Sequence, residues 1–177
     1  MNFKLTNFEI GRIQEKDAWR ICDFMVANSE RFKNDFPDTL KQTLNPTLAT
    51  LFVQEKTKQF NNGEEYLFTV KEEKNRTIIG LLYLKELQKQ QRQGELAYCI
   101  GYQYEGKGLT TLFLNQIIPW AFGKIGLDTL QIIAHKDNKG SLRIAEKLGF
   151  TWKTSLPDAH TRFDGSVVNM ELYEKYR

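Results

Sequence analysis

The 177-residue sequence contains few cysteines, no long apolar run and no apolar leader. Its two cysteines, Cys22 and Cys99, lie far apart, and neither has a cysteine or histidine at the spacing of metal ligands. This pattern argues against a disulfide framework and a zinc site, and it favours a reducing compartment. No apolar run approaches the ~18 residues that a membrane helix needs, and residues 1–10 lack the apolar core of a secretory signal. We therefore expect a cytoplasmic protein that binds no metal and no membrane.

The charge of the chain is nearly balanced. It has 25 basic and 22 acidic side chains, and its net charge is only +3 at pH 7. An excess this small does not predict a nucleic-acid partner, which usually requires a strongly basic face. Hydrophobic residues make up 41% of the chain, and the length suits one domain with its own core. Because no repeat, linker or low-complexity segment interrupts the pattern, we expect residues 1–177 to form a single domain.

The N-terminal half shows strand and helix periodicities in turn. Residues 3–13 alternate loosely and predict a first strand, whereas residues 17–29 predict an amphipathic helix. The apolar face expected for this helix consists of Ala18, Ile21, Cys22, Met25 and Val26. Residues 28–46 are less regular and predict a loop or a short helix.

A second helix is expected to follow, with Thr47 as its cap after Pro46 and the Asn-Asn-Gly of residues 61–63 at its end. Residues 65–73 and 76–87 are rich in β-branched and aromatic side chains. A short polar segment separates them, so they predict a hairpin.

The segment GELAYCIGY at residues 94–102 alternates strictly and predicts a further strand. One face would carry Leu96, Tyr98, Ile100 and Tyr102, and the other Glu95, Ala97, Cys99 and Gly101. More helices and strands are expected at residues 109–121, 129–134, 138–150 and 162–173. Pro119 should kink or end the first of these helices, and Asn138 and Gly149 mark the start and end of the second. The order β-α-α-β-β-β-α-β-α-β-β predicts an α/β (α+β) fold with a mixed sheet.

The segment YQYEGKGLTT places Gly106 and Gly108 between a strand and a helix. Glycines in that position leave backbone N–H groups uncovered at the positive end of the helix dipole, which favours an anion such as a phosphate. A Walker loop would need a hydroxyl residue after Lys107, where Gly108 stands. A dinucleotide fingerprint would need a third glycine in place of Thr111. The turn therefore matches neither of these nucleotide-binding patterns.

The pattern Gln-x-x-Gly-x-Gly at residues 103–108 resembles the pyrophosphate loop of the GNAT acetyltransferases. The segment HKDNKGSLRIAEKLGF at residues 135–150 is similar to the Asn-x-x-Ser and Glu-Lys-Leu-Gly-Phe segment of that family, and residues 94–102 are similar to its central strand. The resemblance covers nearly the whole chain and is strongest to the RimJ/RimL branch, which acetylates N-terminal alanines of ribosomal proteins. It implies the GNAT fold, with a mixed sheet of about seven strands and about four helices. Ala97 and Pro119 depart from the family pattern.

The resemblance implies that acetyl-CoA is the cosubstrate, and it identifies the residues that would bind it. Backbone groups of Tyr98, Cys99 and Ile100 would hold the pantetheine arm, which Asn138 and Ser141 would also contact. The pyrophosphate would lie on a loop formed by Gln103, Tyr104, Glu105, Gly106, Lys107, Gly108, Leu109, Thr110 and Thr111.

The implied reaction is the direct transfer of acetyl from a thioester to a primary amine. Glu95 is the candidate general base and would act through a water. A free α-amino group has a pKa of ~7.7–8.0 and is already partly neutral near pH 7, so the base offers at most about 10²–10⁴-fold. A backbone N–H near Cys99 or Ile100 would stabilise the developing oxyanion, and the Ser141 hydroxyl would protonate the leaving thiolate.

Several of these residues also have a simpler structural interpretation. Cys99 is more readily a small core residue than an acyl-accepting nucleophile, because no histidine is evidently positioned beside it. His135 follows a strand and is more readily structural than catalytic. Three aromatic residues could line an acceptor pocket but more readily pack in the core, namely Trp19, Phe32 and Phe36.

The acceptor stays open between a protein N-terminal α-amino group and a small amine such as a polyamine. A different class of function is also compatible with the pattern, namely a non-catalytic acyl-CoA-binding sensor or scaffold with the same fold. The resemblance further implies a monomer or a homodimer.

Overall fold

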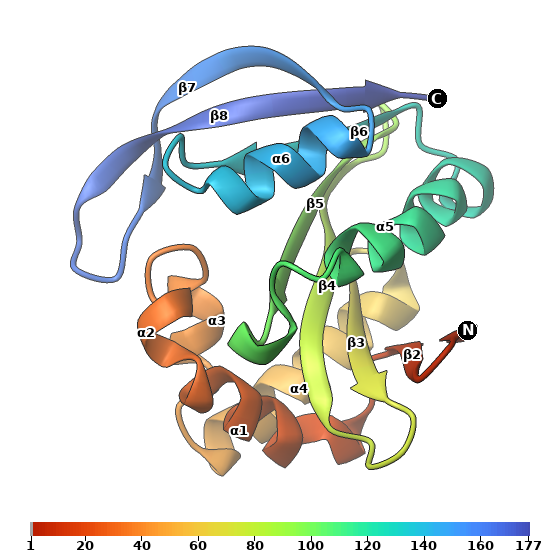
Figure 1. The fold of residues 1–177 in the computed structure, drawn as a ribbon, viewed down its shortest axis with the longest axis vertical. Helices are drawn as coiled ribbons and strands as arrows, with labels where there is room; N and C mark the ends of the chain where they lie inside the picture. The colour runs from red at the N-terminus through yellow and green to blue at the C-terminus, as the bar shows by residue number, and fades with distance from the viewer. Residues whose placement is uncertain (1) are drawn as a thin grey trace. The chain divides into compact units, whose positions relative to one another are not determined.

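The structure, a computed structural model, describes residues 2–177 and divides the chain into two compact units. The first comprises residues 2–83 and Tyr98–Lys107, and the second comprises Leu84–Ala97 and Gly108–Arg177. Eight strands are hydrogen-bonded in the order β1-β2-β3-β4-β5-β6-β8-β7, and helices intervene along the chain (Figure 1). The β5–β6 pair is parallel, whereas the β1–β2, β2–β3, β6–β8 and β7–β8 pairs are antiparallel. The predicted mixed sheet is therefore confirmed, with one strand more than expected.

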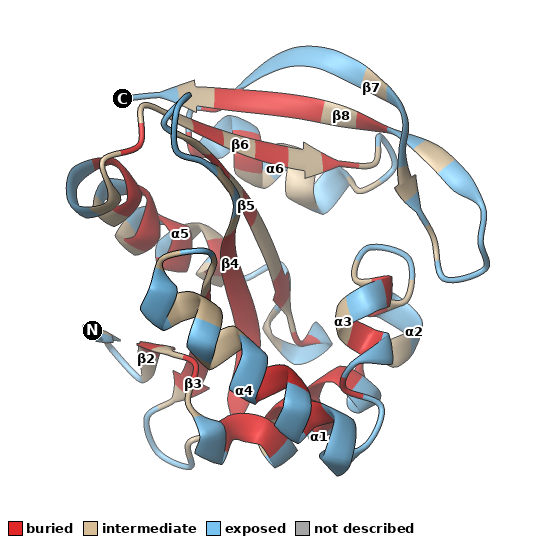
Figure 2. Ribbon diagram, turned by 180° about the vertical axis from the view of Figure 1, so that it is seen from behind, coloured by how far each residue is buried: buried red, intermediate tan, exposed pale blue. Residues whose placement is uncertain are grey.

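The first unit contains the N-terminal strands, the first part of β4 and the last part of β5. The strands are β1 (Asn2–Leu5), β2 (Phe8–Arg12), β3 (Tyr66–Glu72), β4 (Ile78–Gln88) and β5 (Gln93–Ile100). The helices are η1 (Glu15–Asp17), α1 (Ala18–Ala27), α2 (Ser29–Phe32), α3 (Pro37–Lys41), α4 (Pro46–Asn62) and η2 (Tyr102–Tyr104). Helix α4 packs on both α1 and β3, and the inward faces of these elements are buried (Figure 2).

The predicted helix at residues 17–29 is confirmed as α1, with one error in its buried face. Ala18, Ile21, Cys22 and Met25 are buried as predicted, but Val26 is 45% exposed. Phe24 is buried in its place, and its ring packs on Phe32 of α2. The irregular segment after α1 folds as the short helices α2 and α3.

Two local predictions in this unit were wrong in detail. The first strand is a hairpin, because Asn7 adopts a left-handed φ of 70° between β1 and β2, a conformation that asparagine tolerates well. Helix α4 is capped by Asn45, whose side chain accepts a hydrogen bond from the Leu48 N–H at 3.0 Å, and not by Thr47. Pro46 occupies the first helical position, so the cap must precede it.

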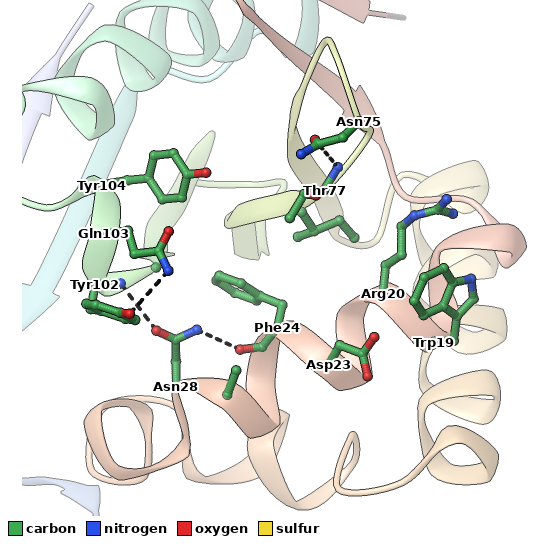
Figure 3. Close-up of a pocket in the computed structure, with 13 residues that line it drawn as sticks. Trp19, Arg20, Asp23, Phe24, Asn28, Asn75, Thr77, Tyr102, Gln103 and Tyr104 are labelled. Atoms are coloured by element: carbon green, nitrogen blue, oxygen red, sulfur yellow. Dashed lines mark hydrogen bonds between the residues drawn. The ribbon is translucent and has the colours of Figure 1, made fainter.

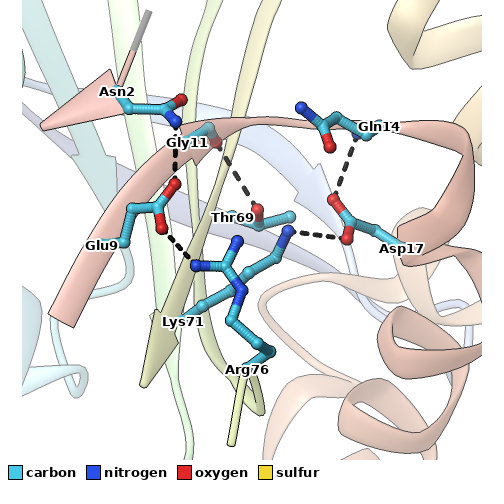
Figure 4. Close-up of polar contacts among 8 residues, drawn as sticks. All are labelled: Asn2, Glu9, Gly11, Gln14, Asp17, Thr69, Lys71 and Arg76. Carbon is cyan, nitrogen blue, oxygen red and sulfur yellow. Dashed lines mark hydrogen bonds and ion pairs between the residues drawn. The ribbon is translucent and has the colours of Figure 1, made fainter. Parts of the chain in front are cut away.

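A buried ion pair joins β3 to the start of α1 (Figure 4). Lys71 Nζ lies 2.6 Å from Asp17 Oδ1, and the two side chains are 6% and 1% exposed. Asp17 Oδ2 also accepts a hydrogen bond from the Gln14 N–H at 3.2 Å. Each charge depends on the other, because an unpaired ion in such a buried position is strongly destabilising.

Lys71→Met is expected to lower the free energy of unfolding by about 3–5 kcal/mol, because it leaves the Asp17 carboxylate buried without its cation. Urea denaturation followed by circular dichroism measures this change. Lys33→Gln is the matched control, since Lys33 pairs with Glu30, whose side chain is 85% exposed, and its loss should cost less than about 1 kcal/mol. Equal losses in the two variants would contradict a structural role for the buried pair.

The second unit contains the remaining parts of β4 and β5 and the C-terminal part of the chain. Its further elements are α5 (Leu109–Trp120), η3 (Ala121–Ile125), β6 (Thr129–Ala134), α6 (Lys139–Lys147), β7 (Thr151–Thr161) and β8 (Val167–Tyr176). Strand β8 lies between β6 and β7 and is buried over much of its length, whereas β7 is mostly exposed (Figure 2). Helix α6 packs on β6 and α5. Helix α5 runs one residue past Pro119 and then widens into the π-helical turn η3.

Candidate active site

Strands β5 and β6 are paired over only a short stretch at their starts. Residues 93–95 of β5 stand opposite residues 129–131 of β6 in parallel register, and pairing within the described chain stops there. In the same register, Leu96 and Ala97 would stand opposite Ile132 and Ile133, which remain paired to β8 on their other side. Among residues 2–177, no β6 residue pairs with Leu96 or Ala97 on this side, so the strand edge there suits an extended ligand that pairs as a strand does.

Glu95 is the last residue of β5 that pairs with β6, and its side chain is only 12% exposed. Lys85 Nζ on β4 lies 3.2 Å from Glu95 Oε1. Burial raises the pKa of Glu95, and the attraction of Lys85 offsets only part of that rise. Glu86 adds a further small increase, and His160 a small decrease. A carboxyl group with a raised pKa exchanges its proton closer to neutral pH, which suits a general base.

The glycine turn lies between β5 and α5, where the sequence predicts it. Gly106 and Gly108 have φ values of 69° and 73°, in the left-handed region that favours glycine. Gly108 is the N-cap of α5, and no side chain caps that helix. A Cβ atom at either glycine would meet nothing within 4 Å, so the surface of the turn is bare backbone. The uncapped start of a twelve-residue helix beside such a surface favours a phosphate.

Residues far away in the sequence hold this turn in place. Asn28 is 8% exposed, and its Oδ1 accepts a hydrogen bond from the Tyr102 N–H at 3.2 Å. The Arg31 guanidinium donates to the Ile100 carbonyl at 3.3 Å and forms an ion pair with Glu105. The Tyr104 hydroxyl donates to Glu72 at 2.7 Å. No local motif in the sequence indicates these contacts, because the partners lie up to 74 residues apart.

The pKa of Tyr104 is raised to about 12, mainly by burial and also by its hydrogen bond to the Glu72 carboxylate. Tyr104 therefore stays a neutral donor throughout the physiological pH range. Lys107 Nζ lies 5.8 Å from the centre of the Tyr104 ring, so the positive charge of the turn is close to the anchored tyrosine. The Tyr104–Glu72 hydrogen bond and the contact between Lys107 and the Tyr104 ring both restrict the motion of the residues that precede Gly108.

A pocket of about 360 Å³ lies in the first unit, beside residues 101–104 (Figure 3). Aromatic rings and side-chain amides line it, including Trp19, Phe24, Asn28, Tyr102 and Gln103. Trp19 is 54% exposed there, which agrees with a pocket-lining role and not with the packing role that the sequence favoured.

Phe32 and Phe36, the other two aromatic candidates for an acceptor pocket, pack against each other with ring centres 6.3 Å apart. Phe36 also stacks on Tyr83. These contacts favour the core interpretation for both phenylalanines.

Helix α6 begins at a capped turn in the second unit. Asn138 is its N-cap, and the Asn138 Oδ1 atom accepts a hydrogen bond from the Ser141 N–H at 3.0 Å. His135 Nδ1 accepts a hydrogen bond from the Asp137 N–H at 3.2 Å, which favours the structural interpretation of this histidine. The cap holds Ser141 in the first turn of the helix, as the sequence predicts.

Comparison with known proteins decides the family. The model of the acetyltransferase (GNAT) domain matches residues 8–151. The chain belongs to the GNAT acetyltransferase family. The resemblance seen in the sequence is thereby confirmed, and the GNAT fold and the assignment as an acyltransferase are confirmed with it.

Two sequence relatives and one solved structure show which acetyltransferases this chain is similar to. The chain is 27% identical to YdaF of Bacillus subtilis (strain 168), which is provisionally named a ribosomal N-acetyltransferase. The match covers 89% of this chain and 81% of YdaF. The chain is 33% identical to the spermidine N(1)-acetyltransferase of Escherichia coli (strain K12), over 41% of this chain and 39% of the other. The structure of RimL, a ribosomal L7/L12 alpha-N-protein acetyltransferase in complex with coenzyme A, matches with a TM-score of 0.89 at 14% identity, covering 99% and 98% of the two chains.

Among residues 2–177 of the GNAT acetyltransferase, no helix is long and apolar enough to cross a membrane. The same residues contain no cluster of three or more histidine, cysteine or acidic side chains that could hold a metal ion.

Cys99 of the GNAT acetyltransferase is buried, and burial raises the pKa of its thiol to about 12. A thiol with that pKa stays protonated at neutral pH and is a poor nucleophile. Cys99→Ala is therefore expected to keep kcat within about tenfold of wild type, whereas loss of a covalent nucleophile would cost at least about 10⁴-fold. Steady-state release of coenzyme A measures the difference. A loss of the larger size in a folded variant would indicate an acyl-cysteine mechanism.

Proposed function

We propose that the protein transfers acetyl from acetyl-CoA directly to a primary amine, and that the preferred acceptor is the N-terminal α-amino group of a protein. The observation that carries this proposal is the bare glycine turn at the uncapped start of α5, which follows a strand that pairs with β6 only at residues 93–95. Together these features suit a ligand with a diphosphate and an extended amide-bearing arm.

In the proposed complex, backbone groups of Tyr98, Cys99 and Ile100 bind the pantetheine arm, which Asn138 and Ser141 also contact. The diphosphate lies on the amides and hydroxyls of Gln103, Tyr104, Glu105, Gly106, Lys107, Gly108, Leu109, Thr110 and Thr111. In this arrangement several main-chain N–H groups together bind the anion, so the lysine and hydroxyl side chains of a Walker loop are not needed. Acetyl-CoA supplies the activated acyl group.

The chemistry needs one proton to leave the amine and one to reach the sulfur. The neutral amine attacks the thioester carbonyl, a C–N bond forms and the C–S bond breaks. Glu95, as its carboxylate, takes the amine proton through a water. The Ser141 hydroxyl gives its proton to the departing thiolate and regains one from solvent water. A backbone N–H near Cys99 or Ile100 stabilises the charge on the carbonyl oxygen.

A small polyamine is the second candidate acceptor, and the local identity to spermidine N(1)-acetyltransferase favours it. The match to YdaF over most of both chains, together with the RimL-like fold, supports a protein N-terminus instead. All three relatives carry acetyltransferase names, which favours an enzyme over a non-catalytic coenzyme sensor.

The acceptor is tested by the release of coenzyme A in the presence of three amines. The first is a peptide with a free N-terminal alanine or serine, the second is the same peptide with a blocked N-terminus and an internal lysine, and the third is spermidine. We expect turnover with the free N-terminus and little with the other two. Turnover with spermidine alone would reassign the acceptor, and no turnover with any amine, despite coenzyme binding, would favour the sensor.

A further inference from the structure

Helix α2 reaches the glycine turn through one charged side chain, Arg31. Its guanidinium NH1 donates to Asn28 Oδ1 at 3.2 Å and to the Ile100 carbonyl at 3.3 Å, and its NH2 pairs with a carboxylate oxygen of Glu105. Asn28 lies between α1 and α2, Ile100 is the last residue of β5, and Glu105 follows in the turn. All of these residues belong to the first unit.

Glu105 presents an electrostatic difficulty for an anion-binding turn. It immediately precedes Gly106, so it adds a negative charge where the proposed function requires a diphosphate to bind. A nearby like charge weakens anion binding unless a cation compensates for it. Arg31 is the cation that pairs with Glu105, and Lys107 of the turn lies instead over the Tyr104 ring.

We infer that Arg31 is a positioning residue for the coenzyme turn: it neutralises Glu105 and, together with Asn28, fixes the end of β5. This inference rests on the proposed function for its consequence, since the affected ligand is the diphosphate of the coenzyme. Arg31 itself acts on the ligand through Glu105 and the turn, and it forms no part of the proton-transfer chemistry.

Two mechanisms follow from this arrangement and can be separated. The electrostatic part depends on the carboxylate of Glu105, so removal of that carboxylate should compensate for removal of Arg31. The mechanical part depends on the hydrogen bonds to Ile100 and Asn28, so it should appear as greater mobility of residues 101–106 even without coenzyme.

The test measures the Kd for coenzyme A by calorimetry in a set of variants. Arg31→Gln is expected to raise Kd about tenfold at low salt, and the increase should shrink in 0.5 M salt, where exposed charges are screened. Adding Glu105→Gln to Arg31→Gln should restore Kd to within about threefold of wild type. Lys33→Gln removes the same charge two positions away on the surface and should leave Kd within about twofold.

An unchanged Kd in Arg31→Gln would overturn the inference. A weakened affinity that is not restored when Glu105→Gln is added to Arg31→Gln would overturn it as well. Amide hydrogen exchange of residues 101–106 in the free protein provides a separate measurement, with faster exchange expected in Arg31→Gln and wild-type rates in Lys33→Gln. If the wild-type protein binds no coenzyme A, the proposed function fails. Unchanged exchange rates would instead refute the anchoring by Arg31, so the two failures are distinguishable.

Discussion

Gly108→Glu is expected to abolish measurable binding of acetyl-CoA while leaving the protein folded. Gly108 has a φ of 73° and is the N-cap of α5, and the space where a Cβ would project is open. A glutamate there adds a negative charge and a bulky side chain to the surface that would hold the diphosphate. We expect Kd to rise by at least about 10²-fold, because charge repulsion and steric exclusion act together. Calorimetric titration with acetyl-CoA measures this change.

Gly165→Glu is the matched control for this substitution. Gly165 also has a positive φ, of 85°, and a Cβ there also meets nothing within 4 Å, but it lies in the turn between β7 and β8. Both variants therefore carry the same backbone strain, of about 1–2 kcal/mol, and the same added charge. Loss of binding in both variants, or in neither, would contradict a diphosphate site at Gly108.

Glu95→Gln is expected to lower kcat by about 10²-fold near pH 7, with a smaller effect above about pH 8, where an α-amino acceptor is already largely neutral. The sign follows from the raised pKa of the buried carboxyl. Wild-type activity should fall as the pH drops through this raised pKa, because protonation removes the base. The part of the acid limb that protonation of Glu95 sets should be absent from the glutamine variant, in which only the ionisation of the acceptor amine should remain. An identical pH profile in both proteins would remove Glu95 from the role of base.

Two further measurements separate catalysis from stability at Glu95. The pKa of Glu95 is higher in the folded protein than in the unfolded chain, so the unfolded chain loses this proton at a lower pH. Between the unfolded pKa and the folded pKa, the contribution of Glu95 to stability therefore declines as the pH rises. The neutral glutamine avoids that decline, so its Tm at pH 7 should be no lower than that of wild type. Glu86→Gln removes a charge that raises the pKa of Glu95 and should shift the acid limb to lower pH without removing it.

Local chemistry explains why some features could be predicted from the sequence. Two glycines between a strand and a helix predict a turn of uncovered backbone, and Gly106 and Gly108 form such a turn, with left-handed φ values. Asn138 was predicted near a helix start because its side chain can cap a helix, and it accepts from the Ser141 N–H. The family resemblance depends on three motifs in a fixed order along the chain, and none of them alone indicates the fold.

Other features depend on contacts that a local pattern does not encode. Arg31 and Asn28 look like ordinary surface-helix residues until folding brings them to Ile100, Tyr102 and Glu105. The pairing of Lys85 with Glu95 likewise depends on how β4 lies beside β5. Strict alternation along β5 also fails to describe its burial, because Leu96 is buried and, three residues later, so is Cys99. These two residues belong to different compact units of the chain.

A crystal structure of the protein with bound coenzyme A tests the central claim most directly. The account predicts a diphosphate on the main-chain N–H groups around Gly106 and Gly108, with the pantetheine arm along β5 beyond Glu95. Coenzyme bound elsewhere on the chain, with that turn covered by protein side chains, would contradict it.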